Sequence, residues 1–98
     1  MEVEFHPEAA AEFTAASVYY EEEVPGLGGA FITELERVAE LIKQHPFIGS
    51  QIDEIFHRVV LARFPFSVIY CLEGEKLLIV AVAHQRRKPG YWRGRLGR

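Results

Sequence analysis

The sequence predicts a single α+β domain, in which a helical hairpin packs on one face of a mostly antiparallel, four-stranded sheet. Three observations support this: an alternating stretch opens the chain, two helical periodicities follow, and three further alternating or apolar stretches come after them. Because helices and strands are segregated, the order β-α-α-β-β-β favours antiparallel pairing with the helices on one side. We expect residues 1–98 to form one domain, since a chain of 98 residues buries one modest core.

The first strand and the first helix lie at the start of the chain. Val3 and Phe5 alternate with polar residues, which indicates a short strand with one buried face. Pro7 suits the first turn of a helix, where its missing N–H costs nothing. The apolar positions that follow repeat at a spacing of three to four, so we expect an amphipathic helix that ends before Pro25.

A second helix follows the glycine-rich residues 26–29. Its apolar positions step by four, three and four residues, with polar residues between them: Phe31, Leu35, Val38 and Ile42. Pro46 ends it. Because the connection between the two helices is short, they are predicted to form an antiparallel hairpin.

Three strands are predicted in the second half of the chain. Residues 55–63 alternate in character, and Pro65 separates them from a second alternating run over residues 66–72. The turn Glu73-Gly74-Glu75 then leads to residues 77–83. These seven positions are all apolar, which favours a central strand covered on both faces.

The composition excludes several classes of protein. No apolar run approaches the roughly 18 residues that a membrane-spanning helix needs, so we expect no membrane partner. The first residues do not resemble a signal peptide. The single cysteine, Cys71, cannot form an internal disulfide. We therefore expect a cytoplasmic protein.

The net charge of −3 hides a strong asymmetry. Residues 1–45 hold ten Glu against two basic residues, a balance of −8, whereas residues 84–98 hold six basic residues and no acid, a balance of +6. The bases of this basic tail are Arg86, Arg87, Lys88, Arg93, Arg95 and Arg98. An unopposed basic tail predicts an anionic partner, or else a solvated tail that maintains solubility. Tyr91 and Trp92 within it favour a binding surface, or else they fold back as a lid on the sheet.

Two segments carry a resemblance to a known family. Residues 61–70 (LARFPFSVIY) resemble an Arg-x-Phe-Pro-aromatic-x-Val/Ile-Ile-Tyr signature, and residues 81–92 (AVAHQRRKPGYW) are similar to a closing His-x-x-Arg-x-Pro-x-Tyr-Trp pattern. Together with the order of elements, the chain resembles the RelE/ParE superfamily of toxins from type II toxin–antitoxin systems, in its ParE-like branch of plasmid stabilisation proteins. The resemblance covers nearly the whole chain and implies a cognate antitoxin that covers the basic surface or displaces the tail.

The ParE-like resemblance implies inhibition of DNA gyrase, which requires no catalytic group in the toxin. The residues expected to bind target or antitoxin are then Arg63, Arg86, Arg87, Lys88, Tyr91, Trp92, Arg93 and Arg95. Arg and Trp are residue types that often anchor interfaces. An alternative for Arg63 is a structural ion pair with Asp53 or Glu54.

The RelE-like alternative is ribosome-dependent cleavage of mRNA. This reaction needs a base, an acid and cations around the phosphate, and the candidate catalytic residues are His84, Arg87 and Tyr91. Two departures weaken this interpretation, because RNA-cleaving relatives carry arginines at the positions of Ser67 and Gln85.

The remaining alternatives are an inactive member that binds only its antitoxin, and a plain nucleic-acid binder that uses arginine and aromatic side chains. No histidine spacing indicates a metal site, and we expect neither a metal nor another cofactor. A homodimer and a toxin–antitoxin heterotetramer are both compatible with the sequence.

Overall fold

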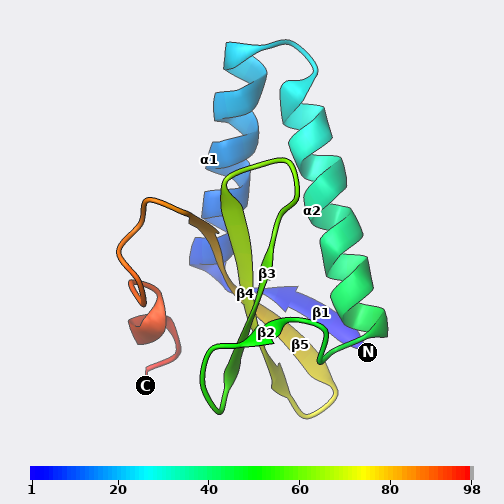
Figure 1. Ribbon diagram of the computed structural model, residues 1–98, viewed down its shortest axis with the longest axis vertical. Helices are drawn as coiled ribbons and strands as arrows, with labels where there is room; N and C mark the ends of the chain where they lie inside the picture. Colours follow the sequence, from blue (N-terminus) through cyan, green and yellow to red (C-terminus); the bar gives the residue numbers. More distant parts are fainter. Residues whose placement is uncertain (98) are drawn as a thin grey trace.

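The computed structural model describes residues 1–97 and confirms the α+β class (Figure 1). Arg98, the last base of the basic tail, lies outside the described residues. The elements are β1 (Glu2–Phe5), α1 (Pro7–Glu23), α2 (Leu27–Gln44), β2 (Ser50–Gln51), β3 (Phe56–Val60), β4 (Phe66–Glu73), β5 (Lys76–His84) and the short 3-10 helix η1 (Arg93–Leu96).

The sheet has five strands in the order β1-β5-β4-β3-β2, one more than expected. The additional strand is β2, whose two exposed residues pair with β3 and are too short to show a periodicity. Parallel pairing occurs between β1 and β5, and the other neighbouring strands are antiparallel. The sheet is therefore mostly antiparallel, as predicted.

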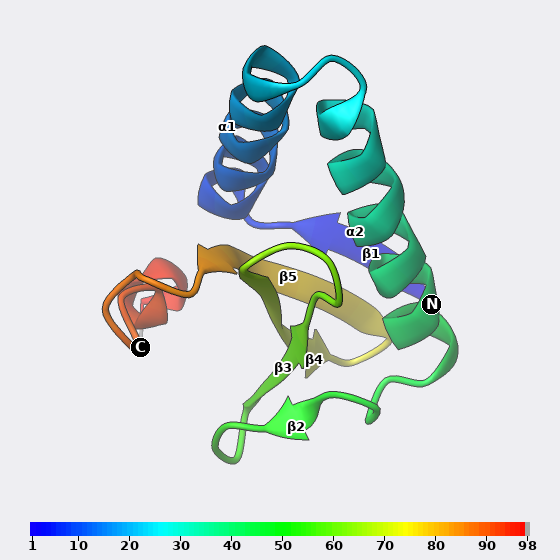
Figure 2. The same cartoon turned by 45° about the horizontal axis from the view of Figure 1, so that its top comes forward.

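The two helices form the predicted hairpin on one side of the sheet (Figure 2). The N-terminus of α1 is capped by His6, whose Nδ1 accepts a hydrogen bond from the N–H of Glu8. At the other end of α1, the carboxylate of Glu21 accepts from the N–H groups of Gly26 and Gly28, at 2.9 and 3.0 Å. Gly28 lets the helices approach closely, because a Cβ there would lie 2.5 Å from the carbonyl oxygen of Ser17.

The main core lies between the helices and the sheet. The four predicted apolar positions of α2 are all buried there, together with Ala9 and Ala16 of α1 and alternate side chains of β4 and β5. Glu34 is the buried acid of α2, and its Oε2 accepts from the N–H groups of Ala62 and Arg63 at 2.7 and 3.1 Å. This contact fixes the loop between β3 and β4 against the hairpin.

A second apolar cluster covers the other side of the sheet. It contains Phe56 of β3, Ile69 of β4, Val80 and Ala81 of β5, and Trp92 of the basic tail. A β-bulge places both Val80 and Ala81 on this side, since Ile69 pairs with Ala81 but Tyr70 pairs with Ile79, which leaves Val80 unmatched. The apolar run in β5 is thus explained by burial on both faces, as predicted.

Candidate functional site

The basic tail leaves the end of β5 and lies beside the start of α1 (Figures 1 and 2), and its apolar residues pack on the helix-free side of the sheet. Trp92 is the main apolar contact of this segment: it is 4% exposed, and its ring packs edge-on against Phe56 with centroids 4.7 Å apart. Tyr91 and Leu96 pack against the same cluster. The tail is therefore docked on the sheet through residues 91–96.

Glu12 of α1 joins the tail to β5. Its carboxylate accepts hydrogen bonds from the N–H of Val82 at 2.9 Å, from the Tyr91 hydroxyl at 2.6 Å and from both terminal nitrogens of Arg95 at 2.9 and 2.7 Å. Arg95 also donates to the carbonyl oxygen of Val80 at 3.0 Å. We call Glu12 and the groups that it and Arg95 bind the Glu12 pin. These groups are the N–H of Val82, the hydroxyl of Tyr91, the guanidinium of Arg95 and the carbonyl of Val80.

The β-bulge explains why the Glu12 pin is placed here. The ladder between β1 and β5 ends at the Phe5–Ile79 pair, so the backbone groups of β5 beyond Ile79 lack partners from β1. Glu12 and Arg95 bond the N–H of Val82 and the carbonyl of Val80 instead. Buried backbone groups need such partners, so the pin stabilises the bulged strand as well as the tail.

The pKa values in the Glu12 pin follow its contacts. Burial raises the pKa of the Glu12 carboxyl, but the hydrogen bonds from Arg95, Tyr91 and Val82 lower it more, and the net shift is downward. Burial and the hydrogen bond to Glu12 raise the pKa of the Tyr91 phenol to about 12. Both groups therefore keep their ordinary charge at neutral pH.

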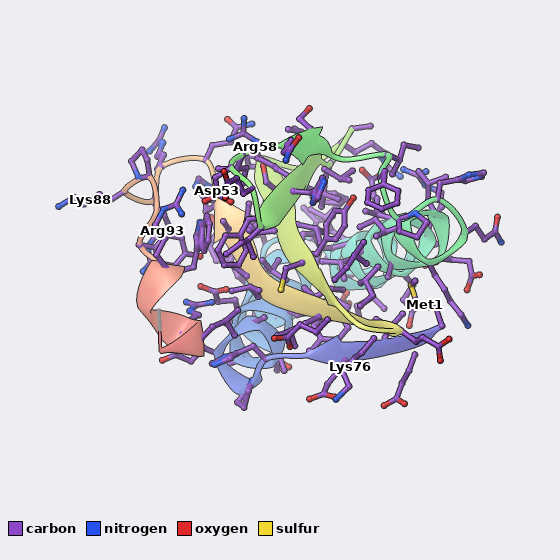
Figure 3. All side chains as sticks on the ribbon, turned by 90° about the horizontal axis from the view of Figure 1, so that it is seen from below. Met1, Asp53, Arg58, Lys76, Lys88 and Arg93 are labelled. Carbon is purple, nitrogen blue, oxygen red and sulfur yellow. The ribbon has the colours of Figure 1, made fainter. Side chains whose placement is uncertain are left out.

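A second clamp holds the tail at its other side. The Nη1 atom of Arg93 lies 2.7 Å from a carboxylate oxygen of Asp53, and Figure 3 shows the two side chains close together. The other oxygen of Asp53 accepts from the N–H groups of Ile55 and Phe56 at 2.8 Å each. These contacts lower the pKa of Asp53 to about 2, and the hydrogen bond from Arg93 contributes most. The predicted alternative pairing of Arg63 with Asp53 is wrong, because Arg93 occupies that carboxylate.

A groove of about 430 Å³ lies beside the docked tail on the helix-free side of the sheet. We call it the sheet groove. Its lining comes from β3, β4, β5, the tail and Ile52 between β2 and β3, and it includes no Asp or Glu. Four of the lining side chains are cationic: Arg58, Arg87, Lys88 and Arg93. In Figure 3, Arg58 lies on the sheet, whereas Lys88 extends away from the body of the protein. The arrangement suits an anion.

A smaller hollow of about 380 Å³ lies on the other side of the tail, between α1 and the end of β5. We call it the apolar hollow. It is lined mainly by carbon, from Ala15, Ala16, Tyr19, Tyr20, Phe66 and Val82, with Glu12, His84, Arg87 and Tyr91 at its polar side. Tyr19 is 56% exposed, so a large aromatic surface is open at this place.

The structure brings the three candidate catalytic residues together. His84, Arg87 and Tyr91 line both the sheet groove and the apolar hollow, and the guanidinium of Arg87 stacks 3.8 Å from the centre of the Tyr91 ring. Ser67 and Gln85 line the same groove without charge. A cationic side chain is therefore missing at two positions of the groove.

The hydrogen bond of His84 limits what its imidazole can do. Its Nδ1 accepts from the N–H of Arg86 at 3.0 Å, so in the neutral ring the proton resides on Nε2. A neutral His84 therefore presents a donor to the solvent side, and it lacks a free lone pair there for a general base. The hydroxyl proton of Tyr91 is donated to Glu12, so it is not free to hydrogen-bond a substrate.

Two predicted binding residues are not presented to a partner. Trp92 is buried, so the alternative in which the aromatic folds back on the sheet describes it correctly, and its role as a surface contact is wrong for this conformation. The side chain of Arg95 is 10% exposed and pairs with Glu8 and Glu12. Both residues face inward because they satisfy the apolar cluster and the bulged strand.

The other predicted binding residues lie at the surface. Arg86, Arg87 and Lys88 are exposed on the segment between β5 and η1, and Arg93 is partly exposed beside them. Arg63 lies apart, in the loop held by Glu34, where its guanidinium is 5.7 Å from the ring of Phe64. The structure thus groups the tail cations and leaves Arg63 outside the sheet groove.

Three important residues were not singled out from the sequence as site residues. Glu12, Asp53 and Arg58 lie 79, 40 and about 30 positions away from the tail residues that they join or face. An acid on the expected buried stripe of α1 is a usable signal for Glu12, since a carboxylate there requires a partner. No local pattern marks Asp53 or Arg58.

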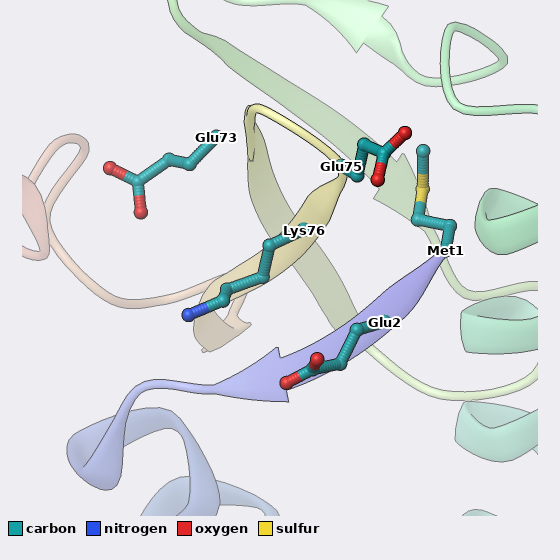
Figure 4. Close-up of a pocket in the computed structure, with 5 residues that line it drawn as sticks. All are labelled: Met1, Glu2, Glu73, Glu75 and Lys76. Carbon is teal, nitrogen blue, oxygen red and sulfur yellow. The ribbon is translucent and has the colours of Figure 1, made fainter.

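A larger hollow, of about 580 Å³, lies at the opposite end of the molecule and has a different character (Figure 4). It is lined by Met1, Glu2, Glu73, Glu75 and Lys76, and Lys76 is paired with Glu4 at 2.9 Å. None of the predicted site residues lies there. Within residues 1–97, no group of three or more His, Cys, Asp or Glu is placed to hold a metal, and no helix has the length and apolar character to cross a membrane.

Comparison with known proteins defines the class to which this fold and this site belong. Residues 3–89 match a family model described as the ParE toxin of type II toxin–antitoxin system, parDE, so the chain is of the class of small toxins encoded with an antitoxin. The match spans most of the 98 residues. The protein belongs to the ParE toxin family, which confirms the resemblance drawn from its sequence.

Among solved structures, the chain is similar to one titled "Chromosomal ParDE TA system from P. aeruginosa". The TM-score is 0.62 at 18% identity, and the match covers 86% of this chain and 95% of that chain. At this identity the similarity supports the fold alone. No curated protein matches the chain.

Proposed function

We propose that the protein is a toxin that inhibits DNA gyrase and is neutralised by a cognate antitoxin. The observation that carries this proposal is the docked basic tail. The Glu12 pin and the Arg93–Asp53 clamp fix the tail at residues 91–95, and the segment between β5 and Tyr91 presents Arg86, Arg87 and Lys88 to the outside. A fixed row of cations is suited to the acidic surfaces of a protein–DNA complex.

The catalytic groups argue against RNA cleavage as the main activity. Ser67 and Gln85 supply no charge to the sheet groove, and neutral His84 lacks a free acceptor nitrogen toward solvent. The pKa of Tyr91, raised by burial and by Glu12 to about 12, makes this phenol a poor acid at neutral pH. A gyrase inhibitor requires none of these functions.

The apolar hollow supports the antitoxin part of the proposal. It offers exposed aromatic carbon next to the tail cations, which is the combination that an amphipathic segment with acidic residues recognises. We expect the antitoxin to cover Tyr19 and Arg87 together. The complex would be cytoplasmic, and it would be a heterotetramer if the antitoxin dimerises.

Ribosome-dependent mRNA cleavage is the second candidate, and one observation favours it. His84, Arg87 and Tyr91 lie around the same groove, because two successive turns, His84–Arg87 and Lys88–Tyr91, bring them together. The Nε2–H that this tautomer of His84 carries would be the proton donor to the leaving oxygen. This activity would make the protein an enzyme that needs no metal.

The experiment that separates the two candidates adds the purified chain to two reactions. One is supercoiling of a plasmid by gyrase, scored for linear product; the other is a ribosome programmed with a defined mRNA, scored for cuts. We expect linear plasmid and intact mRNA, and we expect Arg87→Ala to lose the effect while Arg37→Ala, on the far face of α2, keeps it. Cut mRNA with normal supercoiling would replace the proposal with the second candidate.

A further inference from the structure

Two successive turns at the start of the basic tail bring Arg87 and Tyr91 together. The N–H of Arg87 donates to the carbonyl of His84 at 3.0 Å, and the N–H of Tyr91 donates to the carbonyl of Lys88 at 3.1 Å. The second turn requires Gly90, which follows a proline and has a φ of 76°, in the left-handed region that glycine adopts without strain. The guanidinium of Arg87 consequently lies 3.8 Å from the centre of the Tyr91 ring.

The ring of Tyr91 is held in place by several contacts. Its hydroxyl donates to Glu12 at 2.6 Å, and the guanidinium of Arg95, which is itself bonded to Glu12, lies 5.0 Å from the ring centre. The ring also packs against the second apolar cluster. The Tyr91 ring therefore cannot move without breaking contacts of the Glu12 pin, and it gives fixed support to the side chain that lies over it.

Arg87 is oriented by these contacts and keeps its N–H groups available. Its side chain is 55% exposed, and its Nη1 atom lies 4.0 Å from Glu12, which attracts the guanidinium but is too far away for a hydrogen bond. The face of an aromatic ring attracts a cation, so Tyr91 confines the guanidinium without using its N–H groups. Arg95, by contrast, donates its N–H groups to Glu12. Arg87 is therefore ordered and can still donate to an external carboxylate or phosphate.

We propose that Tyr91 is a positioning residue, which holds the Arg87 guanidinium for the anionic surface of the target and does not contact the target itself. A free arginine side chain loses much rotational freedom when it binds, and a side chain that is already confined loses less. The hydroxyl of Tyr91 is donated to Glu12, and Arg87 lies over its ring, so neither group is presented as a direct contact. This inference rests on the proposed function, since it names the residue that orients one of the cations expected to meet gyrase.

The test separates the ring of Tyr91 from its hydroxyl. Tyr91→Leu removes the ring, and it should raise the chain concentration that half-inhibits gyrase supercoiling about three- to tenfold, the cost of immobilising one flexible side chain at an interface. Tyr91→Phe keeps the ring, and it should inhibit within about twofold of the parent. Gly28→Ala is the control for lost stability, because a Cβ there would lie 2.5 Å from the carbonyl oxygen of Ser17, between the two helices. At a temperature where it stays folded, this control should also inhibit within about twofold of the parent.

NMR of the full chain reports the position of Arg87 in the absence of gyrase. Protons that lie over the face of an aromatic ring are shielded by its ring current. The side-chain protons of Arg87 should therefore be shifted upfield in the parent and in Tyr91→Phe, and they should lose this shift in Tyr91→Leu.

Each contrary outcome has a distinct meaning. Equal losses of inhibition in Tyr91→Phe and Tyr91→Leu would show that the hydroxyl acts directly, and full inhibition by Tyr91→Leu would show that the ring is not needed. A loss in Gly28→Ala as large as that in Tyr91→Leu would reduce the effect to stability. Any of these three results would overturn the proposal. A parent that inhibits gyrase without shifted Arg87 protons would refute the positioning role and leave the proposed function standing. Shifted protons in a parent that does not inhibit gyrase would refute the proposed function, and with it the role of Tyr91 there, although the contact with Arg87 would be real.

Discussion

Replacing Glu12 by glutamine should loosen the basic tail and destabilise the whole domain. The substitution keeps the shape of the side chain but removes its charge, and it turns one oxygen into an NH2 group that faces other donors. In the structure those donors are the N–H of Val82, the Tyr91 hydroxyl and the guanidinium of Arg95. Arg95 would then lose its main counter-charge while its side chain stays 10% exposed.

The magnitude follows from these contacts. Breaking one partner of a largely buried, bidentate ion pair costs about 3–5 kcal/mol, and the 17% exposure of Glu12 with the neighbouring Glu8 reduces this, so we expect about 2–3 kcal/mol. For a domain of this size, that corresponds to a fall in Tm of about 10–20 °C. The loss is a large fraction of the stability of a small domain.

The assay is urea unfolding followed by the fluorescence of Trp92, the single tryptophan, which is buried against Phe56. Glu36→Gln, on the exposed face of α2, is the matched control and should unfold like the parent. If Glu12→Gln unfolds within about 0.5 kcal/mol of the parent, the pin does not stabilise the fold, and the reasoning fails.

The pH dependence of the same variant tests the sign of the pKa shift. The pKa of Glu12 is lowered in the folded protein, so its stabilisation is present above the ordinary value of 4.5 and is lost as pH falls through the folded value. The unfolding curves of the parent and Glu12→Gln should therefore differ at pH 7 and converge as the pH falls below 4.5 and through the lowered folded value. A difference that persists at the lowest pH would point to packing in place of charge.

Three further outcomes are expected. Trp92→Ala should lower the free energy of unfolding by about 3–5 kcal/mol, because it empties a packed site in the second cluster; a stable but non-toxic variant would show that the indole acts as a contact surface. Gly28→Ala should destabilise by about 1–3 kcal/mol, whereas Gly29→Ala, whose Cβ meets nothing within 4 Å, should stabilise by about 0.4–1 kcal/mol; urea midpoints that move in the same direction would contradict this. Asp53 should titrate by NMR near pH 2 and move up toward 3.8 in Arg93→Gln; an unchanged midpoint would show that the clamp is absent in solution.

The sequence predicted most of the fold because periodicity reports burial. The second helix is the clearest case, since all four apolar positions read from its spacing are buried. The segment Ser50–Gln51 was missed because a strand of two exposed residues has no period. The predicted strand over residues 55–63 is shorter in the structure, Phe56–Val60, because the carboxylate of Glu34 binds the backbone at positions 62 and 63 and draws it into a loop.

The site was predicted less well, because composition identifies cations but not their partners. The basic tail can be recognised in the sequence. Its charge does not show, however, that Arg95 forms an ion pair with Glu12 or that Arg93 forms one with Asp53. These pairs join positions 83 and 40 residues apart, and only the folded chain brings them together. Arg58 falls within the alternating pattern of residues 55–63, and the groove that it faces exists only once the tail has docked.

One irregularity of β5 connects the fold to the proposed binding surface. The bulge at Val80 removes the end of the strand from pairing with β1 and leaves backbone groups that Glu12 and Arg95 satisfy. Those contacts come from α1 and from the tail. The hydrogen bonds that satisfy the β5 backbone at Val80 and Val82 therefore also hold the tail against the sheet. The docked tail in turn forms one side of the sheet groove and presents the exposed Arg87 there. A regular β5 would need no such pin, and the free tail would present its cations without a fixed geometry. The bulge is therefore the feature on which a defined binding surface depends, and variants that loosen the pin should weaken gyrase inhibition.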